Sequence, residues 1–209
     1  FGTSMGVTGL NYKKTLSEKT YLTSTVALSY EEQHANHNYI YGRRLNEAGD
    51  SILFDYLSPI MGYTFATTKG TAFVSVNHKF NKQHLIKVGF NMDVFYVNQL
   101  DSAKLLVTDS AFQIRWDYRG TSALFQPFIQ WKCRVTDNMD FTAGLHAQYF
   151  TLSNSKSIVE PRVGWKYRMK NNQSIFAGAG MHSSTQPLYT YTYHKLDEDG
   201  NKVYHNKNM

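Results

Sequence analysis

The sequence predicts an all-β chain, an antiparallel transmembrane β-barrel segment of about eight strands in four hairpins. Three observations predict it: apolar and polar residues alternate over long segments, short polar turns alternate with longer polar connections, and key aromatic residues fall near both strand ends. The mean hydropathy is negative and no run of about 18 apolar residues occurs, which excludes transmembrane helices. A barrel strand needs only alternating apolarity, so a hydrophilic average is compatible with a barrel.

The clearest predicted strand covers 85–97. Its apolar face carries Ile86, Val88, Phe90, Met92, Val94 and Tyr96. A helix would scatter these residues around its cylinder, whereas a strand places them on one side. At roughly 3.3 Å per residue the segment is about 43 Å long, and a tilt of about 45° still lets it cross a bilayer core of about 30 Å. The same alternation recurs over 22–30, 125–135, 141–149 and 159–168.

The connections between strands alternate in length. Short polar turns are expected at 17–19, 81–83, 137–139 and 171–173. Longer polar stretches are expected at 31–64, 99–110, 153–156 and from Thr185 onward. This alternation is typical of outer-membrane barrels, which have short periplasmic turns and long extracellular loops.

Aromatic residues on the apolar faces fall into two bands. One band lies far from the short turns and consists of Tyr30, Tyr96 and Tyr149. The other lies just before the short turns and consists of Phe80, Trp131 and Tyr167. Amphipathic rings settle at the two membrane interfaces, so these six residues are predicted membrane-interface aromatics. The alternative is a soluble sandwich whose aromatics fill its core, with the same period but the opposite face toward water.

The polar faces of the strands would point into the lumen. The candidate ligand-binding or lumen-facing residues are Lys87, Asp93, Lys132, Arg134, His146, Glu160, Arg162, Lys166, Arg168 and His182. Glycines such as Gly89 and Gly164 share these faces. A small closed barrel must fill its interior with side chains, so a wall of glycines and long charged groups favours a wider barrel. The competing reading is that these charges pair with one another across strands.

The net charge of +6 does not indicate nucleic-acid binding, because the basic residues are scattered. The only adjacent basic pairs are Lys13-Lys14 and Arg43-Arg44. No nucleic-acid partner is therefore expected.

No metal, cofactor or catalytic site is predicted. His34 and His37 lie in a polar stretch that is better explained as a solvated loop, and Cys133 is the sole cysteine. The segment 197–201 lacks the spaced acids of a calcium loop, and a turn at Asp199-Gly200 between two short strands is expected instead. No nucleophile elbow or phosphate-binding glycine loop occurs, so the chain is not expected to be an enzyme.

Two stretches carry a family resemblance. The segments 158–167 (IVEPRVGWKY) and 174–183 (SIFAGAGMHS), followed by Gln186-Pro187, resemble the late barrel hairpins of TonB-dependent outer-membrane receptors of the Bacteroidetes type. In these hairpins an "EPR" strand, a short turn and a "GxGxHS" strand lead to "QP". The stretches 124–132 and 206–209 are also similar to that family.

The resemblance implies a barrel of about 22 strands with an N-terminal plug, in a Gram-negative outer membrane. It further implies contact with outer-membrane lipid, a TonB partner acting through the plug, and uptake of a siderophore, vitamin, peptide or glycan ligand. Residues 1–209 are then expected to be a partial barrel domain that lacks the plug and the final strands. Pro127 and Pro161 are expected at strand starts, bulges or unpaired sites, since proline donates no ladder hydrogen bond.

Three alternatives remain at the level of sequence. The first is a complete eight-stranded outer-membrane barrel with a structural or adhesive role, which would pair its first and last strands. The second is a soluble all-β binding domain, which would stay monodisperse without detergent. The third is an outer-membrane hydrolase, which an activity screen would reveal.

Overall fold

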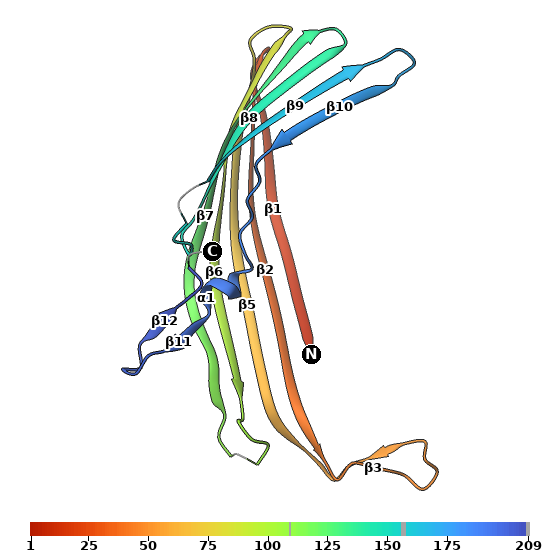
Figure 1. Cartoon of the computed structure of the whole chain (residues 1–209), viewed down its shortest axis with the longest axis vertical. Coiled ribbons are helices and arrows are strands. Elements are labelled where there is room, and N and C mark those ends of the chain that lie inside the picture. Colours follow the sequence, from red (N-terminus) through yellow and green to blue (C-terminus); the bar gives the residue numbers. More distant parts are fainter. Residues whose placement is uncertain (109, 156–157, 208–209) are drawn as a thin grey trace. The chain divides into compact units, whose positions relative to one another are not determined.

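The computed structural model describes residues 1–108, 110–155 and 158–207. Eight strands form one antiparallel sheet in the order β1-β2-β5-β6-β7-β8-β9-β10 (Figure 1). They are β1 (Gly2–Ser17), β2 (Thr20–Tyr41), β5 (Tyr56–Lys79), β6 (His84–Ala103), β7 (Gln113–Thr136), β8 (Met139–Phe150), β9 (Ile158–Arg168) and β10 (Ser174–Gly180). Two short hairpins, β3 (Arg44–Leu45) with β4 (Ile52–Leu53) and β11 (His194–Leu196) with β12 (Lys202–Tyr204), and the helix α1 (Leu188–Thr192) complete the described elements.

The all-β prediction, with eight main strands in four hairpins, is confirmed. Each predicted short turn joins two neighbouring strands: β1 to β2, β5 to β6, β7 to β8, and β9 to β10. In the last of these turns Asn171 and Asn172 have φ angles of 64° and 59°. Asparagine is among the few residues that tolerate this left-handed region, which accounts for the Asn-Asn pair there.

The predicted long connection 31–64 is wrong in its extent. β2 continues to Tyr41 and β5 already begins at Tyr56, so the connection is 42–55 and contains the β3–β4 hairpin. His34 and His37 therefore lie on a strand and not in a loop. The predicted connection 99–110 starts too early in the same way, because β6 runs to Ala103. Ladder hydrogen bonds join backbone groups, so a strand can extend beyond the stretch where its side chains alternate.

The end of β10 also differs from the prediction. The strand stops at Gly180, so strand alternation does not place His182 on the polar face. The predicted turn at Asp199-Gly200 between two short strands is confirmed. Asp197 Oδ1 accepts the backbone N–H groups of Asp199 at 3.1 Å and Asn201 at 2.7 Å, and Gly200 has a φ angle of 81°.

Contacts within the chain separate it into two compact units. Unit 1 consists of residues 1–6, 29–68 and 96–121. Unit 2 consists of residues 7–28, 69–95 and 122–209. The four short turns belong to unit 2, whereas the connection with the β3–β4 hairpin belongs to unit 1.

In unit 1, side chains close the base of the β3–β4 hairpin. The rings of Tyr41 and Tyr56 stack with centroids 4.6 Å apart, and Arg44 Nη1 donates to Asp55 Oδ1 at 2.6 Å. At the tip, hydrogen bonds from Asn46 and Ser51 lower the pKa of the Asp50 carboxyl. These contacts hold the two ends of the connection together and order its tip.

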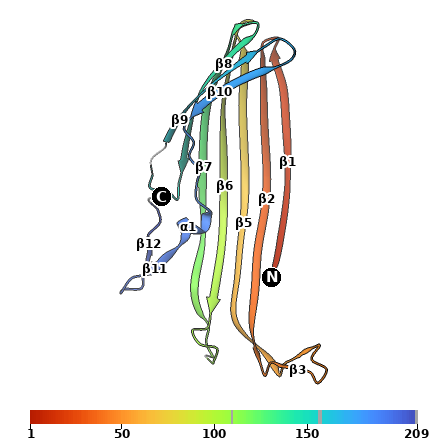
Figure 2. The ribbon, with the colours of Figure 1, turned by 45° about the vertical axis from the view of Figure 1, so that its right-hand side comes forward.

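In unit 2, the helix α1 packs against β7 and β8 (Figure 2). A small apolar cluster joins Leu124 of β7, Phe150 of β8 and Tyr191 of α1, all nearly inaccessible to solvent. The rings of Phe150 and Tyr191 meet edge to face at 5.1 Å. This cluster attaches the segment that follows β10 to the sheet.

The two prolines occupy positions where the sheet needs no N–H donor. The β7–β8 pairing runs from Phe125 directly to Phe128, so Pro127 lies in an unpaired step, as predicted. Pro161 lies within β9, where its carbonyl oxygen accepts the N–H of Met181 at 3.0 Å. The N–H and C=O groups of a strand residue point to the same side. An N–H group at Pro161 would therefore point to the β10 side of β9. On that side the β9–β10 pairing has already ended at Gly180–Arg162, so the ladder needs no donor there.

Candidate functional site

The register of β7, β8 and β9 aligns the candidate residues of unit 2 in rows on one face. Phe128, His146 and Glu160 form one row across the three strands. Arg134, Asp140 and Lys166 form another row nearer the short turns. Residues in one row of a sheet share a face. We call this side of unit 2 the polar face and the opposite side the apolar face.

Glu160 is the most completely enclosed charged residue of the polar face, with an exposed fraction of 0 %. Its Oε2 accepts hydrogen bonds from Arg162 Nη2 at 2.5 Å and pairs with His146 Nδ1 at 3.0 Å. Its Oε1 accepts the backbone N–H of Ser183 at 2.7 Å and the Ser183 hydroxyl. A buried carboxylate is costly unless its oxygens are bonded in this way.

This cluster gives a physical role to the "EPR" and "HS" motifs. Glu160 and Arg162 are two residues apart on β9 and therefore share a face, while Ser183 comes from the segment after β10. The two motifs meet because the chain continues alongside β9 after the β9–β10 pairing ends at Gly180–Arg162, with Met181 bonded to Pro161 and Ser183 to Glu160. Sequence analysis selected Glu160, Arg162 and His146 but missed Ser183, which only the "HS" motif could have indicated.

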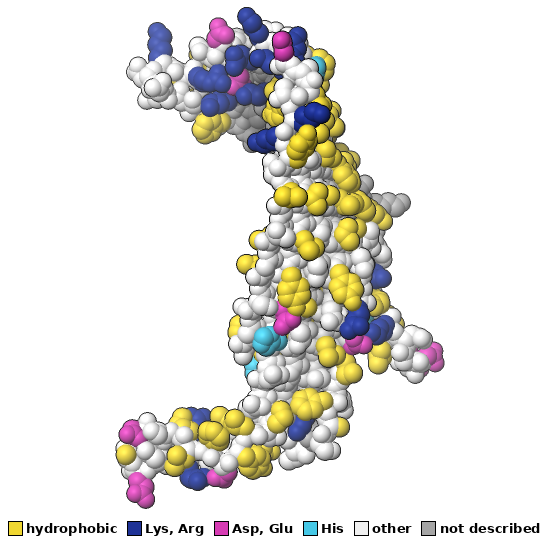
Figure 3. Space-filling model, turned by 180° about the vertical axis from the view of Figure 1, so that it is seen from behind, with side chains coloured by type: hydrophobic (Ala, Val, Ile, Leu, Met, Phe, Trp, Pro, Cys, Tyr) yellow, Lys and Arg dark blue, Asp and Glu magenta, His cyan; other side chains and the backbone are white. Residues whose placement is uncertain are grey.

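Asp140 is the centre of a second cluster, near the β7–β8 turn. Its side chain is 5 % exposed and pairs with Arg168, with Lys132 Nζ at 3.7 Å and with Arg134 Nε at 3.9 Å. Three cations thus surround one carboxylate, which leaves local positive charge. Figure 3 shows Lys and Arg side chains gathered at the end of unit 2 that carries the short turns. The sequence analysis offered the alternative that charges of the polar face pair with one another across strands. That alternative holds for Lys132, Arg134 and Arg168.

Replacing Asp140 with asparagine should lower the free energy of unfolding by about 1–3 kcal/mol, the usual range for hydrogen bonds to charged groups. The change leaves Lys132, Arg134 and Arg168 close together without a neutralising carboxylate. Denaturant unfolding of the detergent-solubilised protein measures the effect. The matched control is Asp199→Asn in the exposed β11–β12 turn, which should unfold like the unmodified protein; equal losses in both variants would contradict the assignment.

Two lysines of the polar face lie over aromatic rings. Lys87 Nζ is 5.4 Å from the ring centroid of Phe128 and 5.9 Å from that of Phe73. Lys166 Nζ is 5.9 Å from the ring centroid of Phe176. Among the described residues neither lysine has an ion pair within 4.0 Å. Gly89 makes room for the Phe128 ring, since a Cβ at Gly89 would lie 2.3 Å from Phe128 Cζ.

Asp93 belongs to a chain of polar side chains that crosses the polar face. Thr71 donates its hydroxyl hydrogen to Asp93 Oδ1 at 2.6 Å, and Asn91 donates to Gln126 Oε1 at 3.1 Å. Gln126 in turn donates to Gln148 Oε1 at 3.1 Å. The chain joins β5, β6, β7 and β8 in unit 2. His182, the remaining candidate, is exposed beyond the end of β10.

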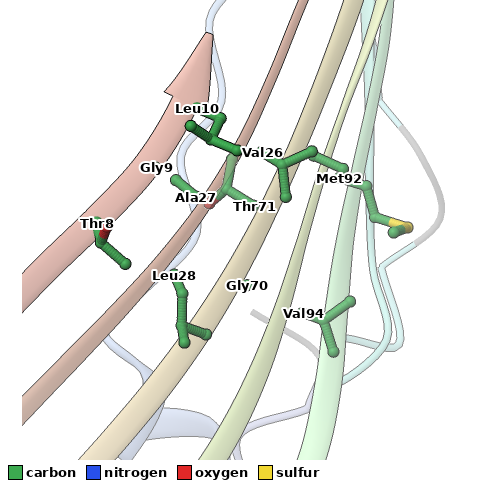
Figure 4. A pocket seen from close by; sticks show the side chains of 11 residues that line it. Thr8, Gly9, Leu10, Val26, Ala27, Leu28, Gly70, Thr71, Met92 and Val94 are labelled. Carbon is green, nitrogen blue, oxygen red and sulfur yellow. The ribbon is translucent and has the colours of Figure 1, made fainter.

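The apolar face of unit 2 carries exposed large side chains. Among them Val88 and Leu145 are each 50 % exposed, and Trp131 and Tyr167 remain 37 % and 39 % exposed. A hollow of about 670 Å³ on this face has Gly70 at its floor and Leu28 and Val94 at its sides (Figure 4). In a soluble sandwich these residues would be covered, whereas here the polar face holds the buried Glu160 and Asp140.

The six predicted interface aromatics are all exposed: Tyr30, Phe80, Tyr96, Trp131, Tyr149 and Tyr167. Two histidines that sequence analysis missed accompany the band near the turns. His78 meets the Phe80 ring edge to face at 4.5 Å, and His84 stacks on Trp131 at 5.7 Å and accepts its indole N–H. His78 is four residues from Val74, and His84 is four residues from Val88. Strand alternation therefore places both histidines on the same face as these valines and could have indicated them.

The structure and the comparisons add no cofactor or family assignment. In residues 1–108, 110–155 and 158–207, no group of three or more His, Cys, Asp or Glu side chains is placed to hold a metal ion. Within the same residues, no helix has the length and apolarity for a membrane crossing. No protein-family model, curated protein or solved structure matches the chain.

Proposed function

We propose that the chain is a segment of a TonB-dependent receptor in a Gram-negative outer membrane. The segment contributes barrel wall, lumen lining and extracellular connections to a protein that takes up a siderophore, vitamin, peptide or glycan. Its mechanism is ligand binding and gated passage without covalent chemistry. Outer-membrane lipid and, through a plug, a TonB partner are the other proposed partners.

One observation carries the proposal: the polarity of unit 2 is inverted relative to a soluble sheet. Exposed apolar residues cover one face, while the buried charges of the other face are paired with one another. An exposed apolar surface of this kind marks contact with another protein or a membrane. Long strands, short turns and exposed aromatics near the strand ends favour the membrane.

The arrangement of the sheet favours a segment of a larger barrel over a complete eight-stranded barrel. β1 and β10 stand at opposite ends of the strand order among the described residues. A closed eight-stranded barrel would pair them. Two unpaired edges would also promote aggregation in isolation, and further strands of the same barrel would cover them.

Cysteine labelling tests which face meets lipid. In a Cys133→Ser background, Ile129→Cys places a thiol on the apolar face and Gln130→Cys places one on the polar face of the same strand. In intact membranes a charged maleimide should label the Gln130→Cys variant, whereas a lipid-soluble maleimide should label the Ile129→Cys variant. The opposite pattern, or equal labelling of both by the charged reagent, would reject the proposed orientation.

Uptake is expected to depend on Lys87 and Lys166. Because they lack a carboxylate partner within the described structure, Lys87→Gln and Lys166→Gln should reduce ligand uptake while leaving assembly in the membrane unchanged. Replacement of Lys132, Arg134, Arg162 or Arg168 should reduce both, since each also pairs with Asp140 or Glu160. Uptake assays with protein quantified in membrane fractions separate the two effects; equal loss of assembly in the Lys87 and Lys166 variants would remove their role in transport.

A further inference from the structure

A cleft of about 450 Å³ lies at the β1–β2 turn and the adjoining end of β5, within unit 2. Its lining includes four lysines, one carboxylate and one buried amide. These residues are Lys13, Lys14, Lys19, Lys79, Glu18 and Asn77. The backbone N–H of Lys79 donates to the carbonyl oxygen of Lys19 at 2.8 Å, so the backbone holds these two lysines beside each other. The cleft is separate from the Glu160 and Asp140 clusters.

The positive charge of the cleft is not neutralised by the protein. In the described part of the chain, neither Glu18 nor any of the four lysines forms an ion pair within 4.0 Å. Lys132, Arg134 and Arg168, by contrast, pair with Asp140, and Arg162 pairs with Glu160. Like charges held close together repel one another, and an anion between them would relieve that repulsion.

Asn77 adds a neutral hydrogen-bond donor to the cleft. It is only 6 % exposed and lines the cleft, yet among the described residues no protein group forms a hydrogen bond with its side-chain amide. Its side-chain amide is not among the buried polar atoms without a partner, so solvent or a bound group can reach it from the cleft. Its N–H groups are therefore available to an acceptor bound in the cleft.

We propose that this cleft binds an oxyanion of the phosphate class. Lysine ammonium groups bind phosphate as point charges, and a neutral amide donor adds a directed hydrogen bond to one oxygen. Lys13 and Lys14 are neighbours on β1 and point to opposite faces, so at most three of the lysines face the cleft together. Less the charge of Glu18, this still matches a phosphate dianion, and the volume admits a diphosphate. The inference goes beyond the proposed receptor function and holds whether or not the chain transports a ligand.

Calorimetric titration of the detergent-solubilised full chain with inorganic diphosphate at low salt tests the proposal. The unmodified protein should bind diphosphate, and the affinity should fall as salt is added because salt screens exposed charges. The double variant Lys13→Gln/Lys79→Gln should bind at least about tenfold more weakly, as expected for loss of two charge-assisted contacts. Asn77→Ala should also weaken binding.

The matched control is Lys82→Gln/Lys170→Gln, which removes the same charge from two exposed lysines outside the cleft. Binding in this control should equal that of the unmodified protein. An absence of diphosphate binding, an affinity that does not change with salt, or an equal loss in the control would overturn the proposal. Nanodiscs containing phosphatidylglycerol identify the natural source: competition with diphosphate supports a lipid headgroup, and unchanged diphosphate binding supports a soluble phosphate.

Discussion

Replacing Leu145 with arginine should reduce the amount of membrane-assembled protein by the largest factor of any single change considered. Leu145 lies at the middle of β8 on the apolar face, between Ile129 of β7 and Pro161 of β9, and it is 50 % exposed. If this face meets lipid, an arginine near the bilayer midplane costs about 2–4 kcal/mol. Quantification of folded protein in outer-membrane fractions, together with unfolding in lipid vesicles, measures the loss.

The matched control is Gly164→Arg on the polar face of β9. Nothing lies within 4 Å of a Cβ at Gly164, and its partner Thr142 is two residues from the carboxylate of Asp140. A guanidinium there reaches water or a carboxylate, so assembly should be close to that of the unmodified protein. If Gly164→Arg were as damaging as Leu145→Arg, or if both were harmless, the assignment of the apolar face to lipid would be wrong.

Replacing Glu160 with alanine should destabilise unit 2 by about 2–3 kcal/mol. Loss of one partner from a fully buried ion pair typically costs about 3–5 kcal/mol, and the figure is discounted here because Arg162 is 43 % exposed. The change also removes the acceptor for both Ser183 donors, so the segment after β10 keeps the Met181–Pro161 backbone bond to β9 but loses both bonds of Ser183. Denaturant unfolding gives the stability, and limited proteolysis of 181–187 reports the detachment.

Three further variants distinguish the Glu160 cluster from a general effect of charge. Glu198→Ala, in the exposed β11–β12 turn, should leave stability and proteolysis unchanged. Ser183→Ala should reproduce a part of the Glu160→Ala loss, and combining it with Glu160→Ala should add little, because interacting partners are not additive. Full additivity of the two losses would show that Ser183 and Glu160 act independently.

Periodicity predicted the parts of the fold in which side chains alternate or turn residues cluster. The eight main strands and the four short turns follow from such local patterns. For example, Asn171 and Asn172 are of a residue type that tolerates the positive φ angles of their turn. The extent of β2 was missed because residues 31–38 are polar apart from Ala35, and the extent of β5 was missed because its first residues carry apolar side chains on both faces. In both segments the backbone ladder continues the strand where side-chain alternation does not indicate it.

The sequence predicted on which face of the sheet the candidate residues lie, but not which of them pair with one another. Alternation placed Lys132, Arg134 and Glu160 on one side of the sheet, as the register confirms. Which carboxylate each cation would meet depends on the exact turn and bulge geometry between strands and on side-chain conformation, which alternation along one strand does not specify. Ser183 joins Glu160 because the segment after Gly180 stays beside β9 although it is no longer a strand, which side-chain alternation does not indicate. The partner of a buried charge was thus beyond reach of the local sequence.

The order of strands has a consequence for how this chain acquires its structure. Every strand of the main sheet lies beside the main-sheet strand that precedes or follows it along the chain, and no crossover interrupts the order. Contacts between neighbours in sequence form quickly, because little chain entropy is lost in closing the short turns that join them. Each hairpin can therefore serve as a template for the next, and gain or loss of one hairpin would leave the pairings of the others intact.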